Sequence, residues 1–139
     1  MIDLILLVVE PCQIKTFFEC DGWQHLIAVA NQDDNLPLCR ERITDLMIRI
    51  SNDQQGRQLI MSEDGVNMII KLANHKDNTP ECSSNMVDLM TIVVSNENAK
   101  HLFLTKGGKG CLISMSNGNL SPSYKLEIFS LLSKIEERI

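Results

Sequence analysis

Residues 56–95 show the pattern of this chain most clearly, and they read GRQLIMSEDGVNMIIKLANHKDNTPECSSNMVDLMTIVVS. The segment from Arg57 to Ser62 contains three consecutive apolar residues and predicts a short helix. Glu63-Asp64-Gly65 is expected to form a turn, because glycine adopts positive φ without steric strain. Val66 to Asn74 has apolar residues at nearly helical spacing and predicts a helix of medium length.

The second half of the same stretch predicts a longer helix. A polar loop from His75 to Pro80 precedes it, and Ser83 is expected to cap its N-terminus. Its apolar stripe at helical spacing consists of Met86, Leu89, Met90 and Val93. One unit of the chain is therefore expected to contain a short, a medium and a long helix.

The unit recurs at an interval of 43 residues. Glycine, asparagine and apolar residues all align at this interval. Because 44% of the residues are hydrophobic, chance would align two or three apolar positions at any interval, but rarely glycine and asparagine as well. The aligned sets include Gly22, Gly65 and Gly108; Asn31, Asn74 and Asn117; Ile43, Met86 and Phe129; and Leu46, Leu89 and Leu132. The three asparagines are expected to cap the C-termini of the medium helices, a position that favours glycine or asparagine.

Two junctions between units carry a resemblance to a known family. Residues 51–60 read SNDQQGRQLI and residues 95–103 read SNENAKHLF. Both resemble the junction between armadillo repeats, and Glu63-Asp64-Gly65-Val66 and Lys106-Gly107-Gly108 resemble the glycine-rich turn before an armadillo second helix. The resemblance covers the chain from about residue 12, and the period also fits HEAT repeats, which are the nearest alternative.

The expected fold is all-α, an armadillo-like right-handed superhelical solenoid of about three three-helix repeats plus a leading helix. The 139 residues fit one continuous domain. We assign residues 1–10 to the third helix of a partial leading repeat and residues 12–53, 54–96 and 97–139 to the three repeats. These three ranges are called the first, second and third unit below.

Charge and composition argue against several classes of partner and indicate a cellular compartment. The net charge is −5 and no Lys/Arg run exceeds two residues, so neither nucleic acid nor an anionic membrane surface is an expected partner. The apolar N-terminal stretch MIDLILLVVEP is shorter than the roughly 20 residues of a spanning helix. Five cysteines without a C-x-x-C pair are typical of a reducing compartment, so an intracellular location, cytoplasmic or nuclear or both, is expected.

No motif predicts catalysis or a cofactor. Lys106-Gly107-Gly108-Lys109-Gly110 lacks the spacing of a phosphate-binding loop. The histidines His25, His75 and His101 do not form a metal-ligand pattern with one another or with cysteine. The chain is therefore expected to be a non-enzymatic protein with no cofactor and no metal.

The resemblance implies that the concave face, formed by successive third helices, holds another protein or an extended peptide. In related units an asparagine near the end of the third helix clamps the peptide; here Arg49 stands there in the first unit and Ile92 or Val93 in the second. The outward side of these helices instead carries a mixed-charge stripe, and its members are the candidate partner-binding residues Arg42, Asp45, Arg49, Asn85, Asp88 and Thr91.

The function expected from these features is that of a scaffold or adaptor, in which Arg42 and Arg49 pair with carboxylates of the partner. A solvated helix face without a binding role is the alternative for the stripe. Trp23 is a possible anchor for a partner, or else a partly buried packing residue. The alternative function is a self-associating module that dimerises through its apolar N-terminal helix or through an end of the solenoid.

Overall fold

The structure is a computed structural model that describes residues 21–32, 35–118 and 120–136, and this part of the chain is all-α. Its helices are α3 (Gly22–Ala30), α4 (Pro37–Ile50), α5 (Gln54–Ile60), α6 (Glu63–Ala73), α7 (Pro80–Val94), α8 (Glu97–Thr105), α9 (Gly108–Ser116) and α10 (Pro122–Glu136). The order of short, medium and long helix predicted within residues 56–95 is confirmed by α5, α6 and α7, and α8, α9 and α10 repeat it. The predicted leading helix, residues 1–10, lies outside the described residues.

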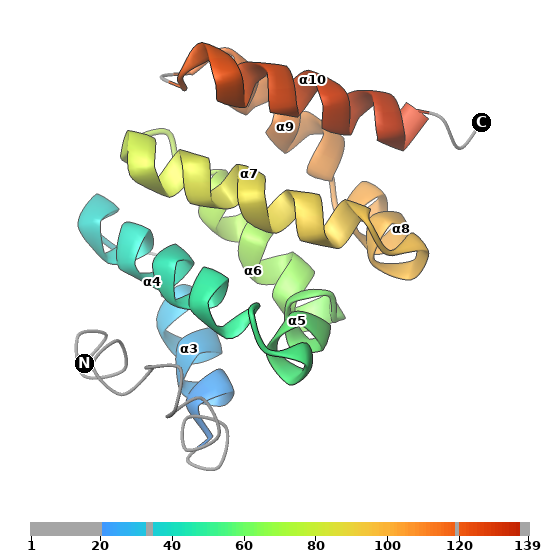
Figure 1. Ribbon diagram of the computed structural model, residues 1–139. Helices are drawn as coiled ribbons and strands as arrows, with labels where there is room; N and C mark the ends of the chain where they lie inside the picture. The colour runs from blue at the N-terminus through green and yellow to red at the C-terminus, as the bar shows by residue number, and fades with distance from the viewer. Residues whose placement is uncertain (1–20, 33–34, 119, 137–139) are drawn as a thin grey trace.

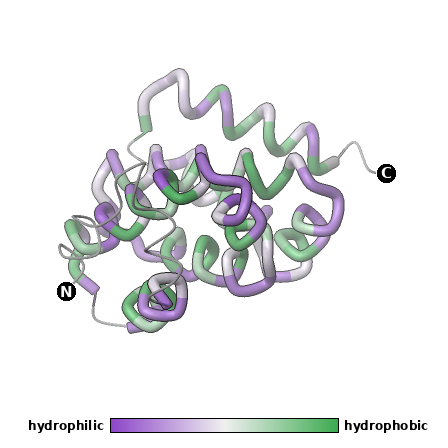
Figure 2. Tube along the Cα trace, turned by 60° about the horizontal axis from the view of Figure 1, so that its bottom comes forward, coloured by the Kyte–Doolittle hydropathy of each residue, from purple (hydrophilic) through white to green (hydrophobic). Residues whose placement is uncertain are grey.

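The helices form two layers and an edge. The long helices α4, α7 and α10 lie side by side and run in the same direction, while α3, α6 and α9 form a second layer behind them (Figure 1). The short helices α5 and α8 lie at one edge, next to the ends of the long helices that precede them. The hydropathy colours alternate along each helix in Figure 2, because each helix turns one face toward the shared core and one toward solvent.

Side chains just before the helices fix where several of them begin. The side chains of Asp53, Ser62, Thr79 and Asn96 each accept a hydrogen bond from a backbone N–H in the first turn of α5, α6, α7 and α8. The expectation that Ser83 caps the long helix is therefore wrong. Thr79 caps it, because Pro80 is well suited to the first helical position, where no N–H is needed.

The predicted turn at Glu63-Asp64-Gly65 is also wrong, because these residues form the first turn of α6. Ser62 accepts a hydrogen bond from the Gly65 N–H, and two acidic residues at a helix N-terminus favour the helix electrostatically. Gly65 is required for a different reason: a Cβ there would lie 2.3 Å from the Ile60 carbonyl oxygen. At the equivalent position, a Cβ on Gly108 would lie 2.4 Å from the Phe103 ring, and positive φ is adopted instead by the preceding Gly107.

Asn31, Asn74 and Asn117 do occupy the C-cap positions of α3, α6 and α9. Their φ angles are −82°, −78° and −93°, so none adopts the left-handed conformation that usually selects asparagine there. Two of them instead connect neighbouring units. The Asn31 carbonyl accepts a hydrogen bond from Lys71 Nζ at 2.6 Å, and the Cys111 thiol lies 3.2 Å from Asn74 Oδ1.

The interval of 43 residues does not hold as far as α10. The long helices begin at Pro37, Pro80 and Pro122, so the last interval between helix starts is one residue shorter. Counted from these prolines, the fully buried Ile43 and Met86 are equivalent to Ile128, which is also fully buried. The alignment of Phe129 with this core position was wrong, because Phe129 is 58% exposed. Likewise Leu131, and not Leu132, is the buried equivalent of Leu46 and Leu89.

Candidate protein-interaction face

A buried arginine connects the first unit to the second. Arg40, in α4, is 1% exposed, and its Nε donates a hydrogen bond of 2.6 Å to Asn78 Oδ1. Its two terminal nitrogens donate to Asp77 Oδ1 and to the Asn35 carbonyl. Arg40 lies on the same helix stripe as the buried Ile43 and Met47, and a charged residue within an apolar stripe was the signal in the sequence that could have identified it.

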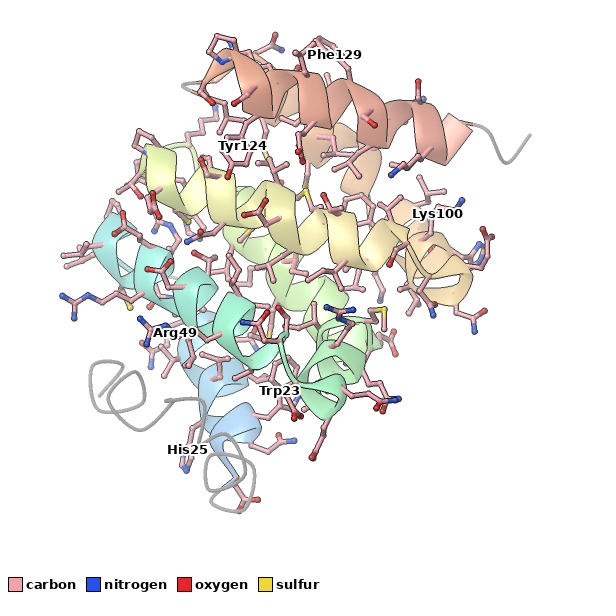
Figure 3. All side chains as sticks on the ribbon, viewed as in Figure 1. Trp23, His25, Arg49, Lys100, Tyr124 and Phe129 are labelled. Carbon is pink, nitrogen blue, oxygen red and sulfur yellow. The ribbon has the colours of Figure 1, made fainter. Side chains whose placement is uncertain are left out.

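The candidate residues of the mixed-charge stripe do not all face solvent. Arg49 and Asp88 are exposed, whereas Arg42, Asp45 and Thr91 are partly buried. Asn85 is only 6% exposed, so its expected position on the outward side is corrected. Trp23, the candidate anchor, is likewise 6% exposed and belongs to the core beneath α3 (Figure 3).

Asn85 is buried because it joins α7 to α4. Its side-chain amide donates a hydrogen bond of 2.8 Å to Asp45 Oδ1 and one of 3.0 Å to Thr44 Oγ1. A second bond, of 2.7 Å from Thr79 Oγ1 to Glu41 Oε1, joins the starts of the same two helices. The face between α4 and α7 is therefore closed by direct side-chain contacts.

The junction between α7 and α10 has different chemistry at the equivalent positions. Counted from the helix-initial prolines, Asp88 corresponds to Asp45, and Glu127 corresponds to Asn85. A carboxylate thus replaces the amide donor, and Asp88 faces a second negative charge instead of a hydrogen-bond donor. Burial raises the pKa of Asp88, and the negative charges of Glu127 and Glu81 raise it further.

Tyr124 borders the same pair of carboxylates and lies between α10 and α7 in Figure 3. The negative charge of Asp88 is the main reason why the pKa of the Tyr124 phenol is raised, and burial and Glu127 contribute in the same direction. The phenol therefore stays protonated and is able to donate a hydrogen bond. This part of the surface combines negative charge with a neutral donor.

A groove opens at the α7–α10 junction, where the amide contact is missing. It consists of two adjoining hollows of about 440 Å³ and about 230 Å³, which share Ser123 and Glu127. The larger hollow is also lined by Thr91, Leu126, Ser130, Leu131 and Lys134, and the smaller by Asp88 and Tyr124. Of the predicted stripe, the structure thus brings Asp88 and Thr91 together at the groove, while the α10 residues that complete it were missed because the sequence was aligned one residue out of register.

The chemistry of the described cysteines is that of packing residues. Burial raises the pKa of the Cys82 thiol to about 11, and burial is also the main cause of the raised pKa values of Cys39 and Cys111. These three cysteines are free thiols. Within the described ranges, no group of three or more His, Cys, Asp or Glu side chains is placed to hold a metal ion.

Comparison with known proteins gives no match: no family model fits the chain, and neither a curated protein nor a solved structure is found to be similar to it. In the part of the chain that the structure describes, no helix has the length and apolar character needed to cross a membrane.

Proposed function

We propose that this protein is a non-enzymatic interaction module, an armadillo-like stack that binds a segment of another protein on the face formed by α4, α7 and α10. The observation that carries the proposal is the difference between the two junctions on this face. At the first, Asn85 closes the surface by its hydrogen bond to Asp45; at the second, Asp88 and Glu127 line an open groove. The surface is thus left open at this junction, where Asp88 and Glu127 bring two negative charges together.

The lining of the groove indicates the chemistry of the segment that fits it. Asp88 and Glu127 together favour a lysine or arginine side chain, whose charge relieves their mutual repulsion. Leu126 and Leu131 offer an apolar surface beside them, and Lys134 lies in the same larger hollow. A segment with a basic residue, an apolar residue and then an acidic or polar residue matches these groups in turn.

The armadillo-like assignment, the adaptor role and an intracellular location belong to the same proposal. The parallel arrangement of α4, α7 and α10 and the repeated order of helices support an armadillo-like stack, with HEAT repeats as the alternative. The free thiols Cys39, Cys82 and Cys111 suit a reducing compartment, cytoplasmic or nuclear. Arg42 and Arg49 remain candidates for contacts with partner carboxylates on α4.

A peptide-display selection on the intact 139-residue chain tests the groove. We expect enriched peptides to contain lysine or arginine, and the double variant Asp88→Lys/Glu127→Lys to weaken their binding at least about tenfold in fluorescence anisotropy. The double variant Glu63→Lys/Asp64→Lys reverses two charges at exposed residues of α6, so it is the control matched in charge and should leave binding unchanged. Failure to enrich any peptide, or equal binding by the double variant, would contradict the proposal.

The α4 contacts need a different variant. Asp45→Arg combined with Arg49→Glu is expected to weaken a partner that reaches α4, but Asp45 also accepts the structural hydrogen bond from Asn85. Arg49→Glu alone separates the two effects, because Arg49 is exposed. Binding that is lost in the double variant but retained in Arg49→Glu would assign the loss to the α4–α7 junction and exclude Arg49 as a contact.

A further inference from the structure

The outer side of α10 exposes two large apolar side chains. Leu126 is 69% exposed and Phe129 is 58% exposed, and Phe129 points away from α7 in Figure 3. Counted from the helix-initial prolines, Phe129 corresponds to Val87 in α7 and to Thr44 in α4, both of which are fully buried. The outer side of α10 is thus the same side that α4 presents to α7, but here it is uncovered.

The second layer, formed by α3, α6 and α9, shows the same contrast between an exposed last helix and a buried preceding one. Ile113 in α9 is 47% exposed, whereas its equivalent in α6, Ile70, is 8% exposed. The apolar contact that joins one unit to the next therefore continues over both α9 and α10. Exposed apolar side chains gathered on one face, at positions that are buried elsewhere in the same stack, indicate an interface.

The stripe on α10 has a shape that is complementary to itself. Leu126, Phe129, Ser130 and Ser133 stand at the spacing i, i+3, i+4 and i+7, so they share one face of the helix, and all four are exposed. If two copies of α10 pack antiparallel about a two-fold axis between residues 129 and 130, Leu126 faces Ser133 of the other copy. Phe129 then faces Ser130, so each large side chain meets a small one.

Charge also favours a second copy over an unrelated partner. In a two-fold contact the same stripe of both copies forms the interface, so a stripe that carried one sign of charge would place like charges together. None of the four stripe residues is charged, although the chain as a whole carries a net charge of −5. This face is therefore one on which two acidic chains can approach without direct repulsion.

We propose that two copies of this chain form an isologous dimer through the outer face of α10, with Leu126 and Phe129 of each copy seated on Ser133 and Ser130 of the other, and Ile113 at the margin. The dimer would cover one side of the groove between α7 and α10, since Leu126 and Ser130 belong to both surfaces. Dimerisation and peptide binding would therefore compete for these two side chains, but each is measured separately, and either proposal stands if the other fails.

Sedimentation equilibrium of the intact chain over a hundredfold range of concentration tests the dimer. We expect a monomer–dimer equilibrium without larger species, and we expect Phe129→Glu to raise its dissociation constant at least about tenfold. Leu38→Glu is the matched control, because Leu38 is 54% exposed on α4 and lies outside the stripe. Circular dichroism of each variant establishes that its helices are intact.

Oxidative crosslinking tests the register. When the single variants Leu126→Cys and Ser133→Cys are mixed, a disulfide between the two introduced cysteines should form and be identified by peptide mass. A chain that is monomeric throughout, a dimer that Phe129→Glu does not weaken, growth beyond the dimer, or absence of that disulfide each overturns the proposal.

Discussion

The Asn85 side chain donates a hydrogen bond of 2.8 Å to Asp45, and one unit later Glu127 and Asp88 occupy the equivalent helix positions and line one hollow. The first pair holds two long helices together, whereas the second pair consists of two carboxylates that repel each other. The face formed by α4, α7 and α10 is thus closed at one junction and open at the next, and the replacement of the amide of Asn85 by the carboxylate of Glu127 is a difference between them that can be tested.

Glu127→Asn is expected to stabilise the fold by about 1 kcal/mol, because it removes a like charge and supplies the amide that Asn85 has at the first junction. Urea unfolding of the variant and of the original chain measures the change. Glu127→Ala removes the charge without adding a donor, so it should give only part of the gain. A Glu127→Asn chain less stable than the original would contradict the equivalence of the two junctions.

The raised pKa of Asp88 predicts a specific dependence of stability on pH. The folded state binds the Asp88 proton more tightly than the unfolded state does, so ionisation of this carboxyl disfavours folding. The resulting loss of stability is absent below the usual pKa of 3.8 and develops as the pH rises through the higher pKa of the folded state. We expect Asp88→Asn to remove this loss, so the gain in urea midpoint over the original chain should be larger at pH 7 than at pH 3.5. A gain that shrinks as the pH rises would contradict the sign.

Arg40 is expected to tolerate no shorter side chain. Arg40→Ala leaves a cavity and removes donors from Asn78, Asp77 and the Asn35 carbonyl, with an expected loss of about 2–4 kcal/mol in the free energy of unfolding. Arg40→Lys retains the charge, but an ammonium group cannot reach three acceptors held in a planar arrangement, so about half of that loss is expected. Arg49→Lys, on an exposed arginine of the same helix, should change stability little. Equal stability of Arg40→Lys and the original chain would show that the forked geometry is unimportant.

Alanine substitutions at three glycines are expected to change the stability of the fold in different directions. Gly65→Ala and Gly108→Ala should destabilise the fold, because their Cβ atoms would overlap the Ile60 carbonyl and the Phe103 ring. A Cβ on Gly110, also within α9, meets nothing within 4 Å, so Gly110→Ala should stabilise by about 0.5–1 kcal/mol through its better helix propensity. Thermal unfolding of the three variants checks the order. A destabilising Gly110→Ala or a neutral Gly108→Ala would contradict it.

The helices and much of the core could be predicted because they follow from periodicity. The stripe of Met86, Leu89, Met90 and Val93 is fully buried as expected, and the order of helices in residues 54–94 follows from the same pattern. The glycine positions were recognised, but for a reason that proved incorrect. A close contact with Ile60 or Phe103 depends on how two helices cross, and sequence spacing carries no information on that distance.

The site was less predictable than the fold. Asn85 and Arg49 are both polar residues of long helices, and the sequence alone gave no means to distinguish the one that joins two units from the one that faces solvent. The groove depends on residues of α10, and one missing residue before Pro122 shifted every position in that helix relative to the expected alignment. The charge of Glu127 could be compared with the amide of Asn85 only after the helix starts were known.

The connection between α9 and α10 is one residue shorter than that between α6 and α7, yet both long helices bury the same side. The connection absorbs the change in length, so the core places little constraint on insertions or deletions there. Over long divergence, arrays of this kind would lose a constant interval between matching residues well before they lose the stack itself. Distant relatives of this chain would accordingly be recognised by the prolines and capping residues that begin their helices, and not by a fixed count along the sequence.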